Sequence, residues 1–378
     1  MSLRCNKTVS RRQFLKGSVM LGITALTQCF PGYSTPPARL DEPRTTPEPP
    51  AIPRRAATDE LNHHIYLPLV SRQEGILAHG PSKLGLHTLS PNNAVGFVRA
   101  VHDAGAYVAL VKALDNFGYV RQVKDISPET TTIGRSMVVQ AVDPSGDPAG
   151  KAASVMDQHM PLWTYERDVV DYWEILNENK PPTMAGHVWL AQFFIAAMDI
   201  AEVNGYKLAL FSYSTGVPEW HEWEAVVETG IFARAKEGGH ALSLHEYDWP
   251  VMDQRWGEPT EDLPPYEDRG VLAGRYRHLY RDFLIPRDEV IPLLITECGL
   301  DPVVGGPVLE QPWQERYVEE MIWYDTKLRE DDYVVGAAMF AIGTVAQWKR
   351  YDYEELLWPN NPYGPASFFD YIVSLKDA

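Results

Sequence analysis

The chain has 378 residues, a formal net charge of −17 and a pI of about 5.1. This length allows one large domain or two medium domains, and 45% hydrophobic residues are enough for a sizeable core. Nucleic acids and anionic lipids bind to basic surfaces, so neither is expected as a partner of this acidic chain. An acidic surface remains compatible with an uncharged substrate.

The N-terminus has the pattern of an export signal. Residues 10–16 (Ser-Arg-Arg-Gln-Phe-Leu-Lys) match the twin-arginine motif, and the apolar run at 19–26 is too short for a stable membrane span. We therefore expect a twin-arginine signal region at 1–32 and export to the cell envelope or the extracellular space. The alternative is a basic tail before a buried helix. Lipid attachment at Cys29 is a minority interpretation, because Gln28 is bulky where a lipoprotein box has a small residue.

Residues 33–76 are expected to form a disordered linker and a segment preceding the main domain. Seven prolines lie between positions 36 and 53, and such a segment cannot bury a core. The paired histidines at 63–64 have no third ligand nearby, and no CxxC or HExxH spacing indicates zinc. Cys298 is the only cysteine beyond the signal region, so no disulfide framework is expected.

From residue 77 to 378, short apolar runs alternate with amphipathic segments. The expected strands span residues 83–87, 107–114, 131–135, 172–179, 207–212, 241–247, 291–297 and 334–340. The expected helices span 94–104, 117–126, part of 152–168, 186–203, 223–236, 271–284, 313–328 and 368–376. This alternation predicts a parallel α/β sheet, and eight units fit a single (β/α)8 TIM barrel. A doubly wound sheet is the alternative, but no glycine-rich GxGxxG follows the first strand.

Two of the expected strands carry a glutamate at or next to their C-terminal end. The run Tyr-Trp-Glu-Ile-Leu-Asn-Glu-Asn at 172–179 carries Glu178, and Ile-Pro-Leu-Leu-Ile-Thr-Glu at 291–297 carries Glu297. Catalytic residues of a (β/α)8 barrel lie at the C-terminal ends of its strands. The fourth and seventh strands face each other across such a barrel, so the sequence predicts a carboxylate pair that suits glycoside hydrolysis.

With these motifs the chain resembles clan A of the glycoside hydrolases, the superfamily that includes families 5 and 39. The resemblance implies a retaining enzyme in which Glu178, in an Asn-Glu pair, is the acid/base and Glu297 is the nucleophile. The His-Glu-Tyr run at 245–247 matches the His-x-Tyr pattern of the sixth strand in that clan. Trp348 follows the eighth strand, where clan members often place a tryptophan under the sugar.

The resemblance also implies supporting roles. Asn177 is expected to hydrogen-bond the sugar 2-OH, and Tyr247 to hold Glu297 in line. Trp348 is expected to stack under the sugar, because aromatic faces suit sugar rings. His245 is either a site residue or a histidine of the core.

The second and third strands depart from the clan pattern. Many members carry an arginine at the end of the second strand, whereas this chain has Lys112 there and Arg135 at the end of the third. Lys112, Arg135 and His87 are therefore site candidates without assigned roles. Trp220 and Trp249, in loops after the fifth and sixth strands, are candidate platforms for further sugar subsites.

The chemistry explains the residue types. Glu297 must be ionised to attack, and Glu178 must carry a proton to donate to the leaving oxygen. The sequence thus predicts an exported retaining β-glycoside hydrolase without a metal or organic cofactor, acting on a β-linked oligo- or polysaccharide. The alternatives are a transglycosidase, a non-catalytic carbohydrate-binding protein on the same barrel, and a metal-dependent lyase or isomerase.

Overall fold

The computed structural model describes residues 80–260, 263–301 and 313–378. The expected signal region (1–32), the possible lipid anchor at Cys29 and the expected linker (33–76) lie outside these residues. The described part contains one sheet of eight parallel strands. They are β1 (Leu84–Thr88), β2 (Leu110–Leu114), β3 (Thr131–Arg135), β4 (Tyr172–Glu174), β5 (Ala209–Tyr213), β6 (Ala241–Asp248), β7 (Leu293–Leu300) and β8 (Val334–Ile342).

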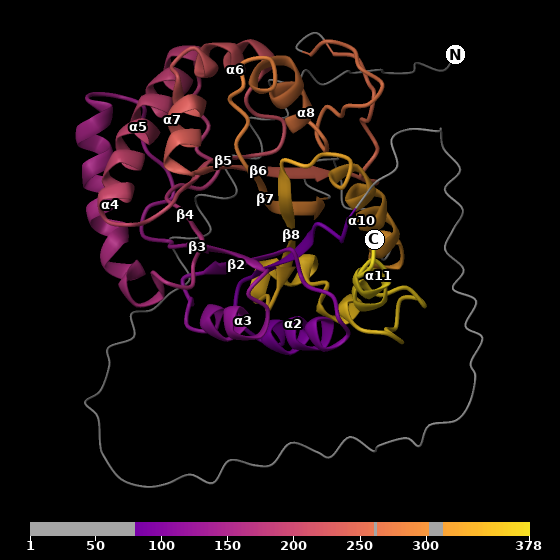
Figure 1. Ribbon diagram of the computed structural model, residues 1–378. Helices are drawn as coiled ribbons and strands as arrows, with labels where there is room; N and C mark the ends of the chain where they lie inside the picture. Colours follow the sequence, from indigo (N-terminus) through magenta and orange to yellow (C-terminus); the bar gives the residue numbers. More distant parts are fainter. Residues whose placement is uncertain (1–79, 261–262, 302–312) are drawn as a thin grey trace, which may run out of the picture. The chain divides into compact units, whose positions relative to one another are not determined.

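The sheet curls into a nearly closed barrel. Its hydrogen-bonded order is β4-β3-β2-β1-β8-β7-β6-β5, and a parallel bridge from Trp173 to Leu208 joins the two ends. Figure 1 shows the strands at the centre and the helices around them. The predicted (β/α)8 TIM barrel is confirmed, and the doubly wound alternative is excluded, because each strand pairs with its chain neighbours around the ring.

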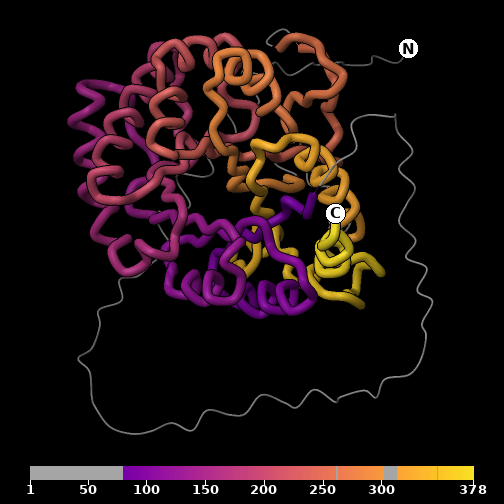
Figure 2. Tube along the Cα trace, viewed as in Figure 1, coloured from indigo at the N-terminus to yellow at the C-terminus, as the bar shows by residue number. Residues whose placement is uncertain are grey.

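The helices form the outer layer (Figure 2). They are α2 (Ala94–Asp103), α3 (Val120–Ile126), α4 (Pro148–Trp163), α5 (Met184–Val203), α6 (Trp220–Val227), α7 (Ile231–Gly238), α8 (Tyr276–Leu279), α10 (Gln314–Leu328) and α11 (Phe368–Ser374). Among the described helices, α5 alone is long and apolar enough to cross a membrane by length and composition. Half of its most apolar stretch is buried inside the protein.

Two expected helices differ in the structure. The single helix predicted at 223–236 is two helices, α6 and α7, because Gly230 between them has a φ of 76° that no helix continues through. The helix predicted at 271–284 begins only at Tyr276 and passes into a π-helical turn, Tyr280–Leu284.

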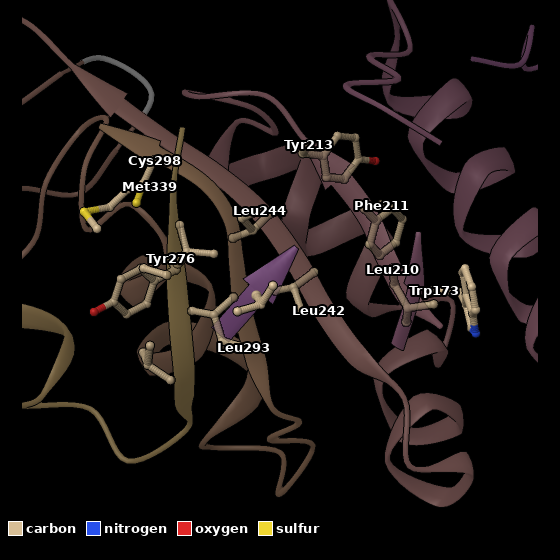
Figure 3. Close-up of a cluster of buried hydrophobic side chains, with 14 of the residues drawn as sticks. Trp173, Leu210, Phe211, Tyr213, Leu242, Leu244, Tyr276, Leu293, Cys298 and Met339 are labelled. Atoms are coloured by element: carbon tan, nitrogen blue, oxygen red, sulfur yellow. The ribbon is translucent and has the colours of Figure 1, made fainter. Parts of the chain in front are cut away.

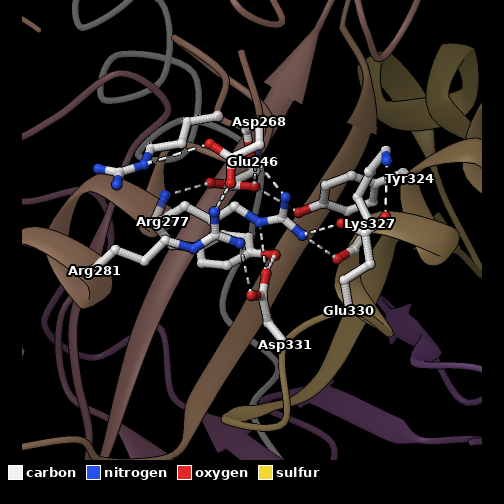
Figure 4. A network of polar contacts seen from close by, with 11 residues as sticks. Glu246, Asp268, Arg277, Arg281, Tyr324, Lys327, Glu330 and Asp331 are labelled. Carbon is white, nitrogen blue, oxygen red and sulfur yellow. Dashed lines mark hydrogen bonds and ion pairs between the residues drawn. The ribbon is translucent and has the colours of Figure 1, made fainter. Parts of the chain in front are cut away.

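Glu246 explains the late start of α8. Its buried carboxylate accepts hydrogen bonds from the backbone N–H groups of Gly274 (2.7 Å) and Tyr276 (3.2 Å) and from the Tyr324 hydroxyl (2.7 Å). This cap holds the segment before α8 out of the helix, and Gly274 supplies the left-handed backbone, with a φ of 75°. In Figure 4 the same region continues into an ion-pair network in which Arg277 contacts Asp331 at 2.6 Å.

The two strands that carry the paired glutamates also differ from expectation. β4 ends at Glu174, so Glu178 lies four residues beyond the strand and not at its last position. β7 continues to Leu300, so Glu297 lies inside the strand. The reason is pairing: β6 hydrogen-bonds β7 as far as Leu300, whereas beyond β4 the chain bonds to a loop, with Asn177 N–H donating to the Gln140 carbonyl at 2.7 Å.

Apolar side chains pack both outside and inside the barrel. The outer core fills the space between strands and helices, and Figure 3 shows part of it, with Trp173, Tyr276 and Met339 among the labelled side chains. Inside the barrel a smaller cluster comprises Leu110, Ile133, Ala209, Ala241, Leu294 and Ala338.

A polar layer lies above the inner apolar cluster. Side chains two residues apart on a strand share one face. Two residues beyond Leu110 and Ile133, the inward positions hold Lys112 and Arg135, and both of these cations are buried. The barrel interior therefore changes from apolar to charged toward the C-terminal ends of the strands, which is where the predicted site lies.

Candidate active site

Two glutamates and one histidine meet at the C-terminal end of the barrel. One carboxylate oxygen of Glu178, one of Glu297 and a ring nitrogen of His245 all lie within 4.8 Å of one another. His245 Nδ1 is 3.1 Å from Glu178 Oε1 and 3.6 Å from Glu297 Oε2. The Glu178 side chain is 42% exposed and that of Glu297 is 10% exposed. One carboxylate therefore faces solvent and the other lies at the floor of the site.

An irregular backbone holds Glu178. Its φ is 49°, which is rare for a residue other than glycine, and its N–H donates to the Ser212 carbonyl at 2.9 Å. Ser212 itself has a φ of 48° and lies where the pairing of β5 with β6 shifts register. Such unusual backbone persists where surrounding contacts enforce it and is concentrated at functional sites. The β5 irregularity thus positions the chain that carries Glu178.

Four predicted candidates surround the Glu297 carboxylate. Lys112 Nζ lies 3.1 Å from Oε1, Arg135 at 3.4 Å and His87 Nε2 at 3.5 Å. The Tyr247 hydroxyl donates to Oε2 at 3.0 Å. The expected contact from Tyr247 is therefore present, and the three residues without assigned roles all lie at this one carboxylate.

These neighbours decide the charge of Glu297. Burial alone would raise the pKa of Glu297, but the electrostatic attraction of His245 and Lys112 outweighs it and holds the pKa well below 4.5. Burial raises the pKa of Tyr247 well above 10, so its phenol keeps the proton that it donates. Burial lowers the pKa of His87 to about 4, so that ring is neutral at pH 7. The floor of the site thus holds one ionised carboxylate.

Glu174 is a site residue that the sequence analysis missed. It is fully buried at the end of β4, with Oε2 2.8 Å from Lys112 Nζ. Burial favours its neutral form, but the charges of Lys112 and Arg135 lower the pKa of Glu174 to about 2. The sequence contained a signal for this residue, because a charged residue inside an otherwise apolar strand must find a partner. Both Glu174 and Lys112 have that pattern.

Phe340 is the second missed residue. This partly exposed ring near the end of β8 lies 4.9 Å from the His87 ring and 6.4 Å from the Tyr247 ring, centroid to centroid. Trp348, in the 3-10 turn Ala346–Tyr351, packs on Phe340 at 5.4 Å. Phe340 therefore lies between Trp348 and the residues around Glu297. An aromatic residue ending the eighth apolar run was the available signal.

Asn177 offers an acceptor that the described protein does not use. Its side-chain oxygen is buried and has no hydrogen-bond partner among the described residues. A buried, unsatisfied acceptor is costly unless a ligand or water pairs with it. This unpaired oxygen lies one residue before Glu178.

The two tryptophans predicted as platforms for further sugar subsites, Trp220 and Trp249, make other contacts in the structure. Trp220 packs its ring on Phe283 at 4.9 Å and donates from Nε1 to Asp282 at 3.0 Å. Trp249 is only 8% exposed and belongs to the outer core. A buried indole offers no open face to a sugar, so the expectation for Trp249 is corrected. Trp220 is the first residue of α6 and not a loop residue, and its contacts join α6 to the π-helical turn Tyr280–Leu284.

Glu178, His245 and Glu297 also have the spacing of a three-ligand metal site within the described residues. Two buried cations, Lys112 and Arg135, already lie beside Glu297. A divalent cation would be repelled by both, so the charges favour a carboxylate pair over a metal centre.

No family model and no curated protein matches the chain. Among solved structures, it is similar to a family 39 glycoside hydrolase from the gut symbiont Bacteroides cellulosilyticus WH2. The TM-score is 0.50 at 11% identity, over 79% of this chain and 64% of that enzyme. The chain thus spans less than two thirds of that enzyme's length.

Two further solved structures are more distant. A variant endo-β-1,4-glucanase from Xanthomonas axonopodis pv. citri gives a TM-score of 0.43 at 11% identity, over 78% of this chain and 99% of that chain. A β-mannanase from Thermomonospora fusca gives 0.40 at 13% identity, over 77% and 87%. The fold comparison rests on the family 39 enzyme, with which the chain shares the (β/α)8 barrel.

Proposed function

We propose that the protein is an exported retaining β-glycoside hydrolase that acts on a β-linked oligo- or polysaccharide. The observation that carries this proposal is the pair Glu178 and Glu297, whose nearest oxygens lie within 4.8 Å. Retaining enzymes hold their two carboxyl groups about 5–5.5 Å apart, whereas inverting enzymes need about 6.5–9.5 Å to admit a water. The observed separation favours retention.

In the first step Glu297 attacks the anomeric carbon, and Glu178 gives its proton to the leaving glycosidic oxygen. The glycosidic C–O bond breaks, and an ester forms between the sugar and Glu297. The low pKa of Glu297 supports the role of nucleophile, because that residue must be ionised. The exposure of Glu178 supports the role of acid, because the proton must reach an oxygen at the mouth of the barrel.

In the second step a water takes the place of the leaving group. Glu178, now ionised, removes a proton from the water, whose oxygen attacks the anomeric carbon and releases Glu297 as a carboxylate. Esterification removes the negative charge of Glu297, so no like charge lies beside Glu178 while it acts as base. The same two residues therefore serve both steps.

The sugar contacts follow from the surrounding side chains. The unpaired Asn177 oxygen is suited to accept from the 2-OH, a bond that strengthens in the transition state. The partly exposed ring of Phe340 is suited to lie under the reacting sugar, with Trp348 beside it for a neighbouring unit. This assigns the nearer aromatic position to Phe340, which the sequence analysis had given to Trp348.

The test is hydrolysis by the signal-free protein against β-glucans, mannans, xylans, galactans and aryl β-glycosides. Glu178→Ala and Glu297→Ala should each lose about 10³-fold or more in kcat/KM on the cleaved substrate. Glu129→Ala is the control, since Glu129 is exposed at the opposite end of the barrel and should leave activity unchanged. Azide should restore Glu178→Ala on an activated aryl glycoside, and NMR of the first product should show the β-anomer.

Other outcomes select the alternatives. A wild-type protein that cleaves nothing but is retarded by a polysaccharide affinity gel is a carbohydrate-binding protein. Products longer than the substrate identify a transglycosidase, in which a sugar replaces water in the second step. Full activity of Glu297→Ala, or loss of wild-type activity with a chelator, contradicts the proposed mechanism.

Export is tested separately. Replacing Arg11 and Arg12 together with lysine should keep the charge but retain the protein in the cytoplasm, because the twin-arginine pathway reads the arginine pair. Cell fractionation with an antibody to the barrel measures the outcome. Unchanged export of this variant would contradict the proposed route.

A further inference from the structure

Glu174 shares a cation with the proposed nucleophile. Lys112 Nζ lies 2.8 Å from Glu174 Oε2 and 3.1 Å from Glu297 Oε1, and the Lys112 and Glu174 side chains are fully buried. A lysine without a second carboxylate would be free to move entirely to Glu297. The contact with Glu174 therefore determines where the ammonium group of Lys112 is held.

The other oxygen of Glu174 is tied to the backbone that carries the proposed acid/base. Glu174 Oε1 accepts from the Ser212 hydroxyl at 2.9 Å, and the Ser212 carbonyl accepts the N–H of Glu178 at 2.9 Å. Ser212 and its neighbour Phe211 both have left-handed backbone at the β5 irregularity. One carboxylate thus contacts both the cation beside Glu297 and the residue that holds Glu178.

A second hydroxyl chain leads from Glu174 toward β7. The Ser243 hydroxyl donates to Glu174 Oε1 at 2.7 Å and lies 2.7 Å from the Thr296 hydroxyl. Because the single proton of Ser243 is used on Glu174, Thr296 donates to Ser243. Thr296 directly precedes Glu297, so Glu174 also constrains the strand beneath the nucleophile.

The charges around Glu174 balance. Two carboxylates, Glu174 and Glu297, share the space with two buried cations, Lys112 and Arg135. Without Glu174, two cations would face Glu297 alone. The positive charge that develops on a sugar in the transition state would then be less favoured, and Glu297 would be drawn more tightly into an ion pair.

We propose that Glu174 is a positioning residue for both glutamates of the site. It holds Lys112 at a fixed place against Glu297 and, through Ser212, fixes the backbone of Glu178. Glu174 itself does not touch the substrate. This inference rests on the proposed glycoside hydrolase function.

The first test is Glu174→Gln, which keeps the size of the side chain and removes its charge. We expect kcat to fall about 10- to 100-fold with KM changed by less than about twofold, because the substrate contacts remain while the reacting groups are misplaced. Asp325→Asn is the matched control, a buried carboxylate on α10 that bonds Lys83 N–H and the Tyr371 hydroxyl. It should lower the melting temperature and leave kcat unchanged.

A double-mutant cycle with Lys112→Gln separates positioning from a merely structural role. Lys112→Gln leaves Glu174 buried without its nearest cation, so the melting temperature should fall by several degrees. Glu174→Gln/Lys112→Gln should recover most of that loss. Its kcat should be no lower than that of the worse single variant, because both residues act through one contact.

The third readout is the titration of Glu297, followed by NMR of protein labelled with 13C at glutamate carboxyl carbons. Glu297→Gln assigns the resonance. In Lys112→Gln and in the double variant, Glu297 should protonate at higher pH than in the wild type, and the acidic limb of kcat/KM should move with it. This measurement does not depend on activity.

The outcomes separate the two proposals. A wild-type protein that hydrolyses no glycoside refutes the proposed function, whatever the titrations show. An active wild type with Glu174→Gln at wild-type kcat, or with additive losses in the double variant, refutes the positioning role alone. A melting-temperature loss in Glu174→Gln without a change in kcat reduces Glu174 to a structural residue and also overturns the inference.

Discussion

At the residue scale, the site is built on one carboxylate that residues from four other strands reach. His87 on β1, Lys112 on β2, Arg135 on β3 and Tyr247 on β6 all lie within 3.5 Å of Glu297. Two of these neighbours supply charge and one donates a neutral hydrogen bond. They hold the carboxylate ionised and limit its rotation, as a nucleophile requires.

Removing the hydroxyl of Tyr247 tests that restraint. Tyr247→Phe should lower kcat about 10- to 100-fold, since a hydrogen bond to a charged group contributes about 1.5–3 kcal/mol. KM should change little, because the ring remains. Tyr280→Phe is the control: its hydroxyl donates to the Ile291 carbonyl at 2.9 Å, away from the site, so only stability should fall. Wild-type kcat in Tyr247→Phe would contradict the assigned contact.

The aromatic platform gives a second prediction at this scale. Phe340→Ala should lower kcat/KM about 10-fold or more, through a higher KM as well as a lower kcat, because the reacting sugar loses a stacking face. Trp348→Ala should have the smaller effect on short substrates, since Trp348 lies beyond Phe340. Steady-state kinetics on an aryl monoglycoside and on an oligosaccharide measure both. A larger loss in Trp348→Ala than in Phe340→Ala on the monoglycoside would instead place Trp348 under the reacting sugar.

At the element scale, the packing of β4 against the helix layer requires a small residue on β3 beside the large Trp173 of β4. Trp173 on β4 stacks on Trp163 of α4 at 4.6 Å and is fully buried. It pairs in register with Gly134 on β3, where an added Cβ would lie 2.3 Å from the indole ring. The glycine thus makes room for the tryptophan that joins β4 to the helix layer.

Gly134→Ala should therefore destabilise the protein by about 1–3 kcal/mol, the usual cost of overpacking a core. Gly96→Ala is the matched control with the opposite sign. Gly96 is exposed in α2 with open space around it, so alanine should stabilise by about 0.5–1 kcal/mol. Denaturant unfolding measures both. Equal stability of the two variants would contradict the packing of Trp173.

At the scale of the whole molecule, buried carboxyl groups and buried histidines set the pH dependence of stability. Burial raises the pKa of Glu246 from 4.5 to about 7 and that of Asp325 from 3.8 to about 6. In the opposite sense, Lys112 and Arg135 overcome burial and lower the pKa of Glu174 to about 2. The raised pKa values of Glu246 and Asp325 make the folded state less stable as pH rises. The lowered pKa of Glu174 makes the folded state less stable as pH falls.

The melting temperature should pass through a maximum at about pH 6–7. Burial lowers the pKa of four histidines to about 4 (His87, His159, His187 and His278), so they add stability as pH rises to about 6.5. The folded state binds more protons at Glu246 than the unfolded state between pH 4.5 and 7, so stability falls as pH rises through that window. Stability from Glu174 is present above pH 4.5 and is lost as pH falls toward 2. Thermal unfolding from pH 3 to 8 at constant ionic strength measures the curve.

The variant Glu246→Gln tests whether Glu246 causes a loss of stability as pH rises from 5 to 8. A pKa raised from 4.5 to about 7 corresponds to about 3 kcal/mol above pH 7, so the variant should lose less stability as pH rises from 5 to 8. An unchanged slope would contradict the assignment to Glu246. A melting temperature that rises steadily from pH 4.5 to 8 would contradict the contribution of the raised carboxyls as a group.

The order of elements was accessible from the chain alone. Apolar runs and amphipathic segments predicted eight strand–helix units, and residues 131–135 coincide with β3. Local patterning suffices here, because a strand or helix is defined by the periodicity of its own side chains. The Asn-Glu pair and the glutamate of the seventh run could likewise be singled out as candidates, since both follow apolar runs.

Only the tertiary structure decided which side chains meet. Lys112 and Glu297 are 185 positions apart, and no local pattern joins them. The burial of Trp249 and the extension of β7 depend in the same way on partners elsewhere in the chain. The sequence by itself determined the strand–helix order and the candidate glutamates. The barrel's closure determined their charges and contacts, because electrostatic and packing energies depend on distances between strands that sequence periodicity does not encode.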